Sequence, residues 1–138
     1  MLSAMSELNL WGVLLATVVG FVAAGIYFGV IIAKPYNVSL GRTNQPPSKP
    51  TPLFIVGPLA CSLIVVIATA TLLRALHIES LVHALQLGSF IGIGFILPMC
   101  MNIAINPNFP RPFLYFGINA PYFFLNSLAT SAILYWMA

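Results

Sequence analysis

Polar side chains at helical spacing in the last apolar segment are the first place where this chain could do chemistry. Asn119, Tyr122, Asn126 and Thr130 follow one another at intervals of three, four and four residues, which places them on one face of a helix. An amide that faces lipid without a partner costs several kcal/mol, so these groups need partners. Either this polar stripe hydrogen-bonds to the preceding helix and fixes its register, or it lines a small hydrated cavity that holds a solute or lipid headgroup.

Asn102, in the preceding apolar segment, is the other candidate for ligand contact. It follows Pro98 by about one helical turn, and a proline inside a helix frees a carbonyl in the turn before it. The absence of a charged group at mid-membrane argues against proton- or sodium-coupled transport. The residues predicted to bind a ligand are Asn102, Asn119, Tyr122 and Asn126.

Ionisable side chains gather around one short turn, at Arg74, His77, Glu79 and His83. Glu79 and His83 are four residues apart and face each other if a helix begins early there. Two histidines with one carboxylate match a metal site poorly, and no second histidine pair is present for a bis-histidine haem. We therefore expect charge pairing at the membrane surface, without a metal or another cofactor.

Sequence motifs of enzymes are absent, among them Gly-x-Ser-x-Gly, His-Glu-x-x-His and Gly-x-x-x-x-Gly-Lys. Only two acidic residues are available for acid-base catalysis, so the sequence favours a protein that is not an enzyme. A lipid-modifying enzyme that uses Asn102, Asn119 and Tyr122 remains an alternative. The net charge of +3 suits anionic lipid headgroups and gives no argument for a nucleic-acid partner.

Four long apolar segments must position these residues, at about 8–33, 53–76, 81–105 and 113–136. Each is long enough to cross a bilayer of ~30 Å as a helix that rises ~1.5 Å per residue. A composition of 60% hydrophobic and 5% charged residues is not that of a soluble domain. The sequence predicts an all-α fold, an integral membrane four-helix up-down-up-down bundle, in which residues 1–138 form a single transmembrane domain.

The connections between these segments differ in length. Residues 34–52 form a proline-rich loop that we expect to be an extended polar connector, whereas residues 76–80 and 106–112 are short turns between antiparallel helices. Pro58, Pro98 and Pro121 lie inside predicted helices, so we expect kinks near them.

The basic residues predict the orientation in the membrane. Lys34, Arg42 and Lys49 lie in the first loop and Arg111 in the third, while only Arg74 lies toward the opposite side, which also carries Glu7. By the positive-inside rule these two loops are cytoplasmic and both termini are outside. In a bacterium this would be the cell membrane.

Small residues spaced by four allow helices in lipid to approach closely. Either these residues pack the helices within one chain, or they form an interface in a homo-oligomer. The residues predicted to form helix-packing faces are Gly12, Ala16, Gly20 and Ala24, Gly25 and Gly29, and Ala84, Gly88 and Gly92.

Three stretches together resemble the small membrane proteins of the Domain of Unknown Function 1761 (DUF1761) family. They are residues 20–29 followed by Lys34, residues 88–95, and Arg111-Pro112 with Asn119, Tyr122 and Trp136. The resemblance spans nearly the whole chain and implies a four-helix membrane fold without an established activity.

The expected function is that of a small multi-pass membrane protein, surrounded by membrane lipid, that binds or passes a small neutral or apolar solute as a homo-oligomer. The alternative is an accessory or assembly subunit of a larger membrane complex, for which packing faces without catalytic groups are sufficient.

Overall fold

A computed structural model describes residues 2–43 and 51–138 of the chain. All the regular secondary structure in these residues is helical. The elements are α1 (Leu2–Ser6), α2 (Leu10–Ile26), η1 (Tyr27–Ile31), α3 (Ala33–Ser39), α4 (Pro52–Ala75), α5 (Leu81–Ile91), η2 (Gly92–Ile96), α6 (Leu97–Ala104) and α7 (Pro112–Trp136). The π-helical segments η1 and η2 continue α2 and α5 directly.

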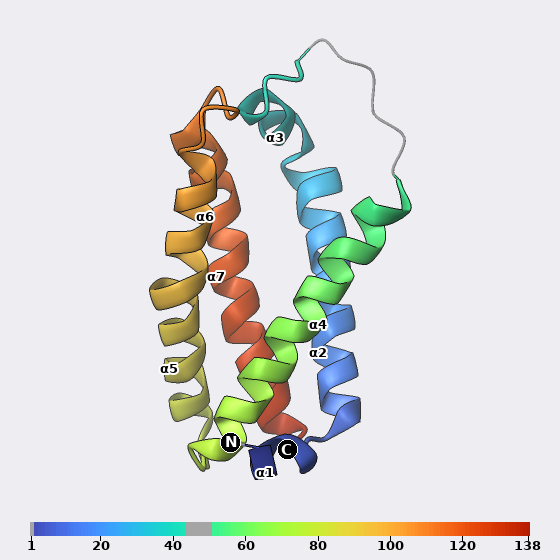
Figure 1. Cartoon of the computed structure of the whole chain (residues 1–138), viewed down its shortest axis with the longest axis vertical. Helices are drawn as coiled ribbons and strands as arrows, with labels where there is room; N and C mark the ends of the chain where they lie inside the picture. The colour runs from blue at the N-terminus through green and yellow to red at the C-terminus, as the bar shows by residue number, and fades with distance from the viewer. Residues whose placement is uncertain (1, 44–50) are drawn as a thin grey trace.

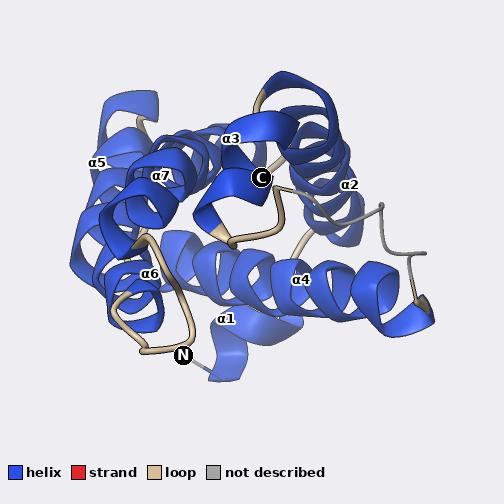
Figure 2. Ribbon diagram, turned by 90° about the horizontal axis from the view of Figure 1, so that it is seen from above, coloured by secondary structure: helices blue, strands red, loops and turns tan. Residues whose placement is uncertain are grey.

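The C-terminal helix α7 lies at the centre of the fold. It contacts α2 on one side and α5, η2 and α6 on the other (Figure 1). α4 packs mainly against α2 and lies obliquely to the other long helices when seen from above (Figure 2). The buried residues of α4, from Val66 to Leu73, all lie in its C-terminal half, while Leu53 near its start is 79% exposed. α4 therefore packs into the bundle mainly through its C-terminal half.

Small residues allow α7 to approach both of its neighbours. A Cβ atom added to Gly88 would lie 2.8 Å from the Ser127 carbonyl oxygen, and one added to Gly92 would lie 2.6 Å from the Ser127 hydroxyl oxygen. On the other side, a Cβ on Gly12 would lie 2.9 Å from the Met137 Cβ, and one on Gly20 2.8 Å from the Asn126 Oδ1. These glycines thus pack helices within one chain.

Local sequence signals account for the starts of α2, α4, α5 and α7. The Asn9 side chain accepts hydrogen bonds from the amides of Trp11 and Gly12, and the Ser80 hydroxyl accepts one from the amide of His83. Both are N-cap arrangements that satisfy amides in the first turn of a helix. The helices α4 and α7 instead begin at a proline, whose missing amide hydrogen costs nothing in the first turn.

The first predicted helix is not continuous to residue 33. The α-helical hydrogen bonds change to π-helical ones over Tyr27–Ile31, and Ile32, with φ −115° and ψ 17°, breaks the helix. The chain then forms α3 over Ala33–Ser39, so the prediction of an extended connector is wrong for these residues. Pro35 does not prevent this helix because it lies in the first turn. The proline-rich stretch 44–50 lies outside the described residues.

The three internal prolines have different effects on their helices. The π-helical segment Gly92–Ile96 directly precedes α6, which has Pro98 in its first turn, so the predicted distortion there is a change of helix type. α4 and α7 are α-helical on both sides of Pro58 and Pro121.

The short helix α1 has no counterpart among the predicted segments.

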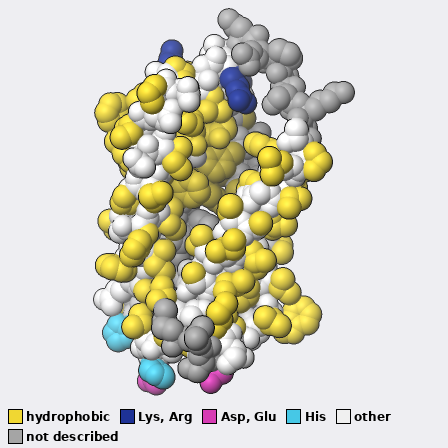
Figure 3. Space-filling model, in the orientation of Figure 1, with side chains coloured by type: hydrophobic (Ala, Val, Ile, Leu, Met, Phe, Trp, Pro, Cys, Tyr) yellow, Lys and Arg dark blue, Asp and Glu magenta, His cyan; other side chains and the backbone are white. Residues whose placement is uncertain are grey.

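Three stretches of the described chain are long and apolar enough to cross a membrane: residues 10–31, 52–75 and 81–104. Large apolar side chains, such as Val30 and Phe54, are exposed along them and cover much of the surface in Figure 3. This exposure is consistent with a location in a membrane, where lipid would cover these side chains. α7 has 25 residues but is not among the three, because polar residues such as Asn119 and Asn126 lower its mean hydropathy.

Candidate functional site

A cavity of about 390 Å³ lies at one end of the bundle, between the start of α2, the end of α4 and the end of α7. We call it the end cavity. Its apolar part is formed by Leu73, Ile78 and Leu134, of which Leu73 and Leu134 are 8% and 6% exposed. Both the residues before α2 and the turn after α4 contribute polar groups to its rim. The end cavity is therefore amphipathic, with an apolar floor and a charged entrance.

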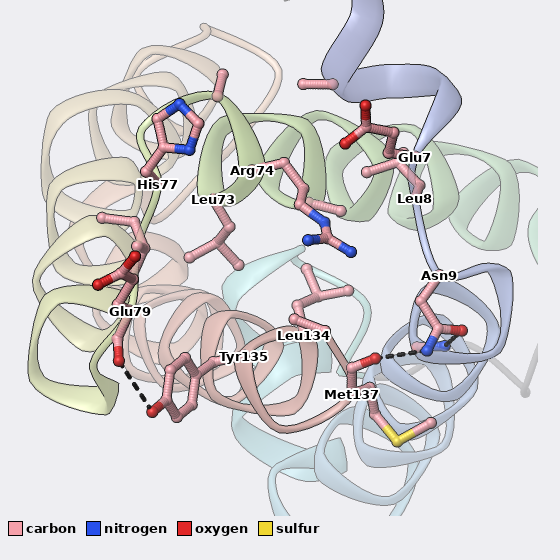
Figure 4. A pocket seen from close by; sticks show the side chains of 16 residues that line it. Glu7, Leu8, Asn9, Leu73, Arg74, His77, Glu79, Leu134, Tyr135 and Met137 are labelled. Carbon is pink, nitrogen blue, oxygen red and sulfur yellow. Dashed lines mark hydrogen bonds between the residues drawn. The ribbon is translucent and has the colours of Figure 1, made fainter.

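Both acidic residues of the chain line this cavity, together with Arg74 and His77. Figure 4 shows the Arg74 guanidinium pointing into the middle of the cavity, with Glu7 at one rim and Glu79 and His77 at another. Within the described part of the chain, Arg74 forms no ion pair or hydrogen bond with either carboxylate. Its donors are thus available to an anionic group in the cavity.

Hydrogen bonds and backbone geometry hold this rim in place. The Asn9 side-chain amide, which caps α2 through its oxygen, donates to the Met137 carbonyl and joins the start of α2 to the end of α7. The Tyr135 hydroxyl donates to the Glu79 carbonyl at 3.3 Å, joining α7 to the turn before α5. His77 has a positive φ of 49°, a conformation that is uncommon outside glycine but that histidine, like asparagine and aspartate, adopts more often than other residues. It reverses the chain directly after α4.

The polar stripe of α7 does not line the end cavity. The buried Asn119 amide donates to the Tyr115 carbonyl of its own helix at 2.7 Å, and the Tyr122 hydroxyl donates to the Gly20 carbonyl at 2.8 Å. Asn126 is half-buried, and its Oδ1 occupies the space that a side chain on Gly20 would fill. Tyr122 and Asn126 of the stripe therefore contact α2, whereas the sequence left open a contact with the preceding helix or a hydrated cavity.

Asn102 is exposed on α6 and makes no hydrogen bond to another described residue. Tyr122 and Asn126 thus both contact Gly20, whereas Asn102 forms no hydrogen bond with either of them. Whether these residues bind a ligand stays a prediction.

The small-residue faces separate into packed and open ones. Ala16 and Ala84 are 1% and 0% exposed and lie in the same core cluster as Leu134 of α7. Ala24 is half-buried. A Cβ added to Gly25 or Gly29 meets no atom within 4 Å, so this pair remains an open face on α2 and η1.

Aromatic rings gather toward the opposite end of the bundle. Tyr27 stacks on Tyr122 with ring centroids 5.5 Å apart, and its hydroxyl donates to the Ile118 carbonyl at 2.9 Å. The ring centroids of Tyr36, in α3, and Tyr115 are 6.0 Å apart. Burial raises the pKa of the Tyr36 phenol. These contacts tie η1 and α3 to α7 and leave Tyr36 a hydrogen-bond donor at neutral pH.

Glu7 and Asn9 are the polar side chains of the end cavity that were absent from the sequence-based candidates, apart from Tyr135. The signal for Glu7 was its position beside the first apolar segment, on the side where an up-down path also places Arg74 and Glu79. Asn9 gave no signal beyond its place before a helix. The charge pairing expected between Glu79 and His83 is not found among the residues that the structure describes. The same residues contain no group of three potential metal ligands.

Comparison with known proteins identifies one family. The model of the family described as "Protein of unknown function (DUF1761)" matches residues 11–135, which is most of the chain. No curated protein and no solved structure matches the chain.

Proposed function

The chain belongs to the DUF1761 family of proteins of unknown function, and we propose that it is a four-helix membrane protein that binds a small zwitterionic solute in the end cavity. The observation that carries this proposal is the Arg74 guanidinium, which points into the cavity between two carboxylates and has no hydrogen-bond or ion-pair partner among the described residues. Arginine binds carboxylate or phosphate groups, while Glu7 and Glu79 offer acceptors to an ammonium group. A solute with both charges is neutral overall.

The same proposal includes an up-down-up-down path in which α7 is the fourth spanning helix. α7 is shielded from lipid on two sides. Gly20 of α2 lies against Tyr122 and Asn126 of the polar stripe, and Gly88 of α5 lies against Ser127. A central helix with such neighbours needs less hydropathy to cross a membrane than a helix that faces lipid. In this arrangement Lys34, Arg42 and Arg111 face the cytoplasm and the end cavity opens outside.

Native mass spectrometry tests the binding function. The protein would be extracted gently from its own membrane, and every co-released molecule would be recorded for the unmodified chain and for Arg74→Gln. Losing a hydrogen bond to a charged group costs about 1.5–3 kcal/mol, so we expect occupancy to fall by about tenfold or more. Lys34→Gln removes the same charge at the other end and serves as the matched control. Equal occupancy in all three proteins would refute the proposal.

A homo-oligomer is a second proposal, favoured by one observation. Gly25 and Gly29 form the only pair of predicted packing glycines that the described chain leaves open, and they lie between the exposed residues Val22 and Val30. A second copy or a subunit of a larger complex would pack there. The same mass spectra give the subunit number, and a stoichiometric foreign polypeptide would favour the accessory-subunit alternative.

A further inference from the structure

A second hollow of about 500 Å³ opens on the side of the bundle, between α1, α2 and α4. We call it the side groove. Apart from Ser6, its lining is apolar and includes Leu8, Val13, Leu14, Leu63 and Ile67. Its volume lies in the range of ~300–1,000 Å³ that is typical of small-molecule pockets.

The side groove adjoins the end cavity. Leu8 lines both hollows, in the short segment between α1 and α2. The other groove residues named above belong to residues 10–31 and 52–75, which are apolar enough to cross a membrane. The end cavity lies where residues 10–31 begin and where residues 52–75 end. Moving into the membrane, a ligand would thus meet charged groups first and an apolar surface next.

We infer that the ligand of the end cavity is the head of a phospholipid with phosphate and primary ammonium groups, and that one of its acyl chains lies in the side groove. This inference rests on the proposed function and names the class of its solute. Arg74 binds the phosphate, and Glu7 or Glu79 accepts hydrogen bonds from the ammonium group. A free zwitterion, such as an amino acid, would satisfy the end cavity but would leave the side groove without a role.

The two hollows contribute differently to recognition. An acyl chain that leaves the bilayer for the side groove exchanges one apolar environment for another and gains little free energy. Selectivity therefore comes from the headgroup, and the groove determines where the chain lies. An experiment on this inference must locate the chain, because affinity alone would not report it.

Photolabelling locates the chain directly. The full-length protein would be placed in nanodiscs of phosphatidylglycerol that contain a small fraction of phosphatidylethanolamine with a diazirine at mid-chain. After irradiation, mass spectrometry would identify the labelled residues. We expect labelling at residues 10–14 and 63–67 to exceed that at Phe90 and Ile93, which are exposed on the far helices α5 and η2.

Two variants and one control make the result specific. Arg74→Gln should lower groove labelling by about tenfold, the change expected from one lost charge-assisted contact, while labelling at Phe90 stays the same. Leu63→Trp should fill the groove and lower labelling at residues 10–14. Lys34→Gln, which removes a charge at the other end, should change neither the groove labelling nor the labelling at Phe90.

The outcomes separate this inference from the proposed function. Groove labelling that equals the labelling of Phe90 and does not respond to Arg74→Gln overturns the phospholipid assignment. Soluble glycerophosphoethanolamine is then added to the same protein. If it binds in a way that depends on Arg74, the proposed function stands and only the acyl-chain assignment fails. If it does not bind either, both fail.

Discussion

The Tyr122 hydroxyl donates a 2.8 Å hydrogen bond to the Gly20 carbonyl, across 102 positions of the sequence. Gly20 allows this approach because it has no Cβ, and the Asn126 Oδ1 occupies the space where one would lie. The carbonyl of Gly20 is thus shared between the hydrogen bonds of α2 and a side chain of α7. This contact fixes the register of the first long helix against the last.

Tyr122→Phe should therefore destabilise the fold without changing its shape. Removing one such hydrogen bond inside a membrane protein costs about 0.6–1.5 kcal/mol, so we expect the free energy of unfolding to fall by that amount in a denaturant titration. Tyr135→Phe is the control, because its bond to the Glu79 carbonyl is longer, at 3.3 Å, and exposed. An effect of Tyr135→Phe as large as that of Tyr122→Phe would contradict the assigned role of the Gly20 contact.

Gly88→Ala should destabilise the contact between α5 and α7. The new Cβ would lie 2.8 Å from the Ser127 carbonyl oxygen, which belongs to backbone and cannot rotate away. Overpacking of this kind costs about 1–3 kcal/mol, measurable by thermal unfolding. Gly94→Ala is matched to it, since a Cβ there meets no atom within 4 Å. If the two variants unfold at the same temperature, the close packing of α5 on α7 is refuted.

Leu substitutions in the polar stripe distinguish the two sites for a solute. Asn119 and Asn126 do not line the end cavity, so Asn119→Leu and Asn126→Leu should leave solute occupancy unchanged within about twofold, as for independent sites. Native mass spectra of the folded variants check this. Loss of the solute from a correctly folded variant would move the site from the end cavity to the stripe.

Helix positions were predictable from the sequence because apolar length and proline place them. The expected segment 53–76 corresponds to α4 at Pro52–Ala75, and 113–136 to α7 at Pro112–Trp136. The packing of Gly12 and Gly88 against α7 could not be assigned, since spacing identifies a small-residue face but does not identify its neighbour. The end cavity was missed for a related reason. Its charged residues are spread from Glu7 to Glu79 and meet only when the helices are packed.

Gly25→Leu with Gly29→Leu should weaken self-association. A Cβ atom added at either position meets no described atom within 4 Å, and both glycines are exposed, so the monomer fold should be unaffected. At an interface between copies, the added bulk would cost about 1–3 kcal/mol. Energy transfer between labelled copies in vesicles measures this loss. Gly117→Leu, at an equally open glycine of α7, should leave transfer unchanged. A protein that shows no transfer in its unmodified form would refute the homo-oligomer.

Cysteine accessibility should place the end cavity outside the cell. Basic side chains are seen at the end of the bundle that carries α3, whereas acidic side chains and histidines are seen at the other end (Figure 3). Translocating basic residues is unfavourable, so the α3 end should remain in the cytoplasm. In a chain with Cys61 and Cys100 replaced by Ala, an impermeant maleimide should label Glu79→Cys in intact cells. It should label Arg42→Cys only after permeabilisation. The reverse pattern would refute the orientation and leave the end cavity without access to outside solutes. Labelling of both in intact cells would refute a single orientation.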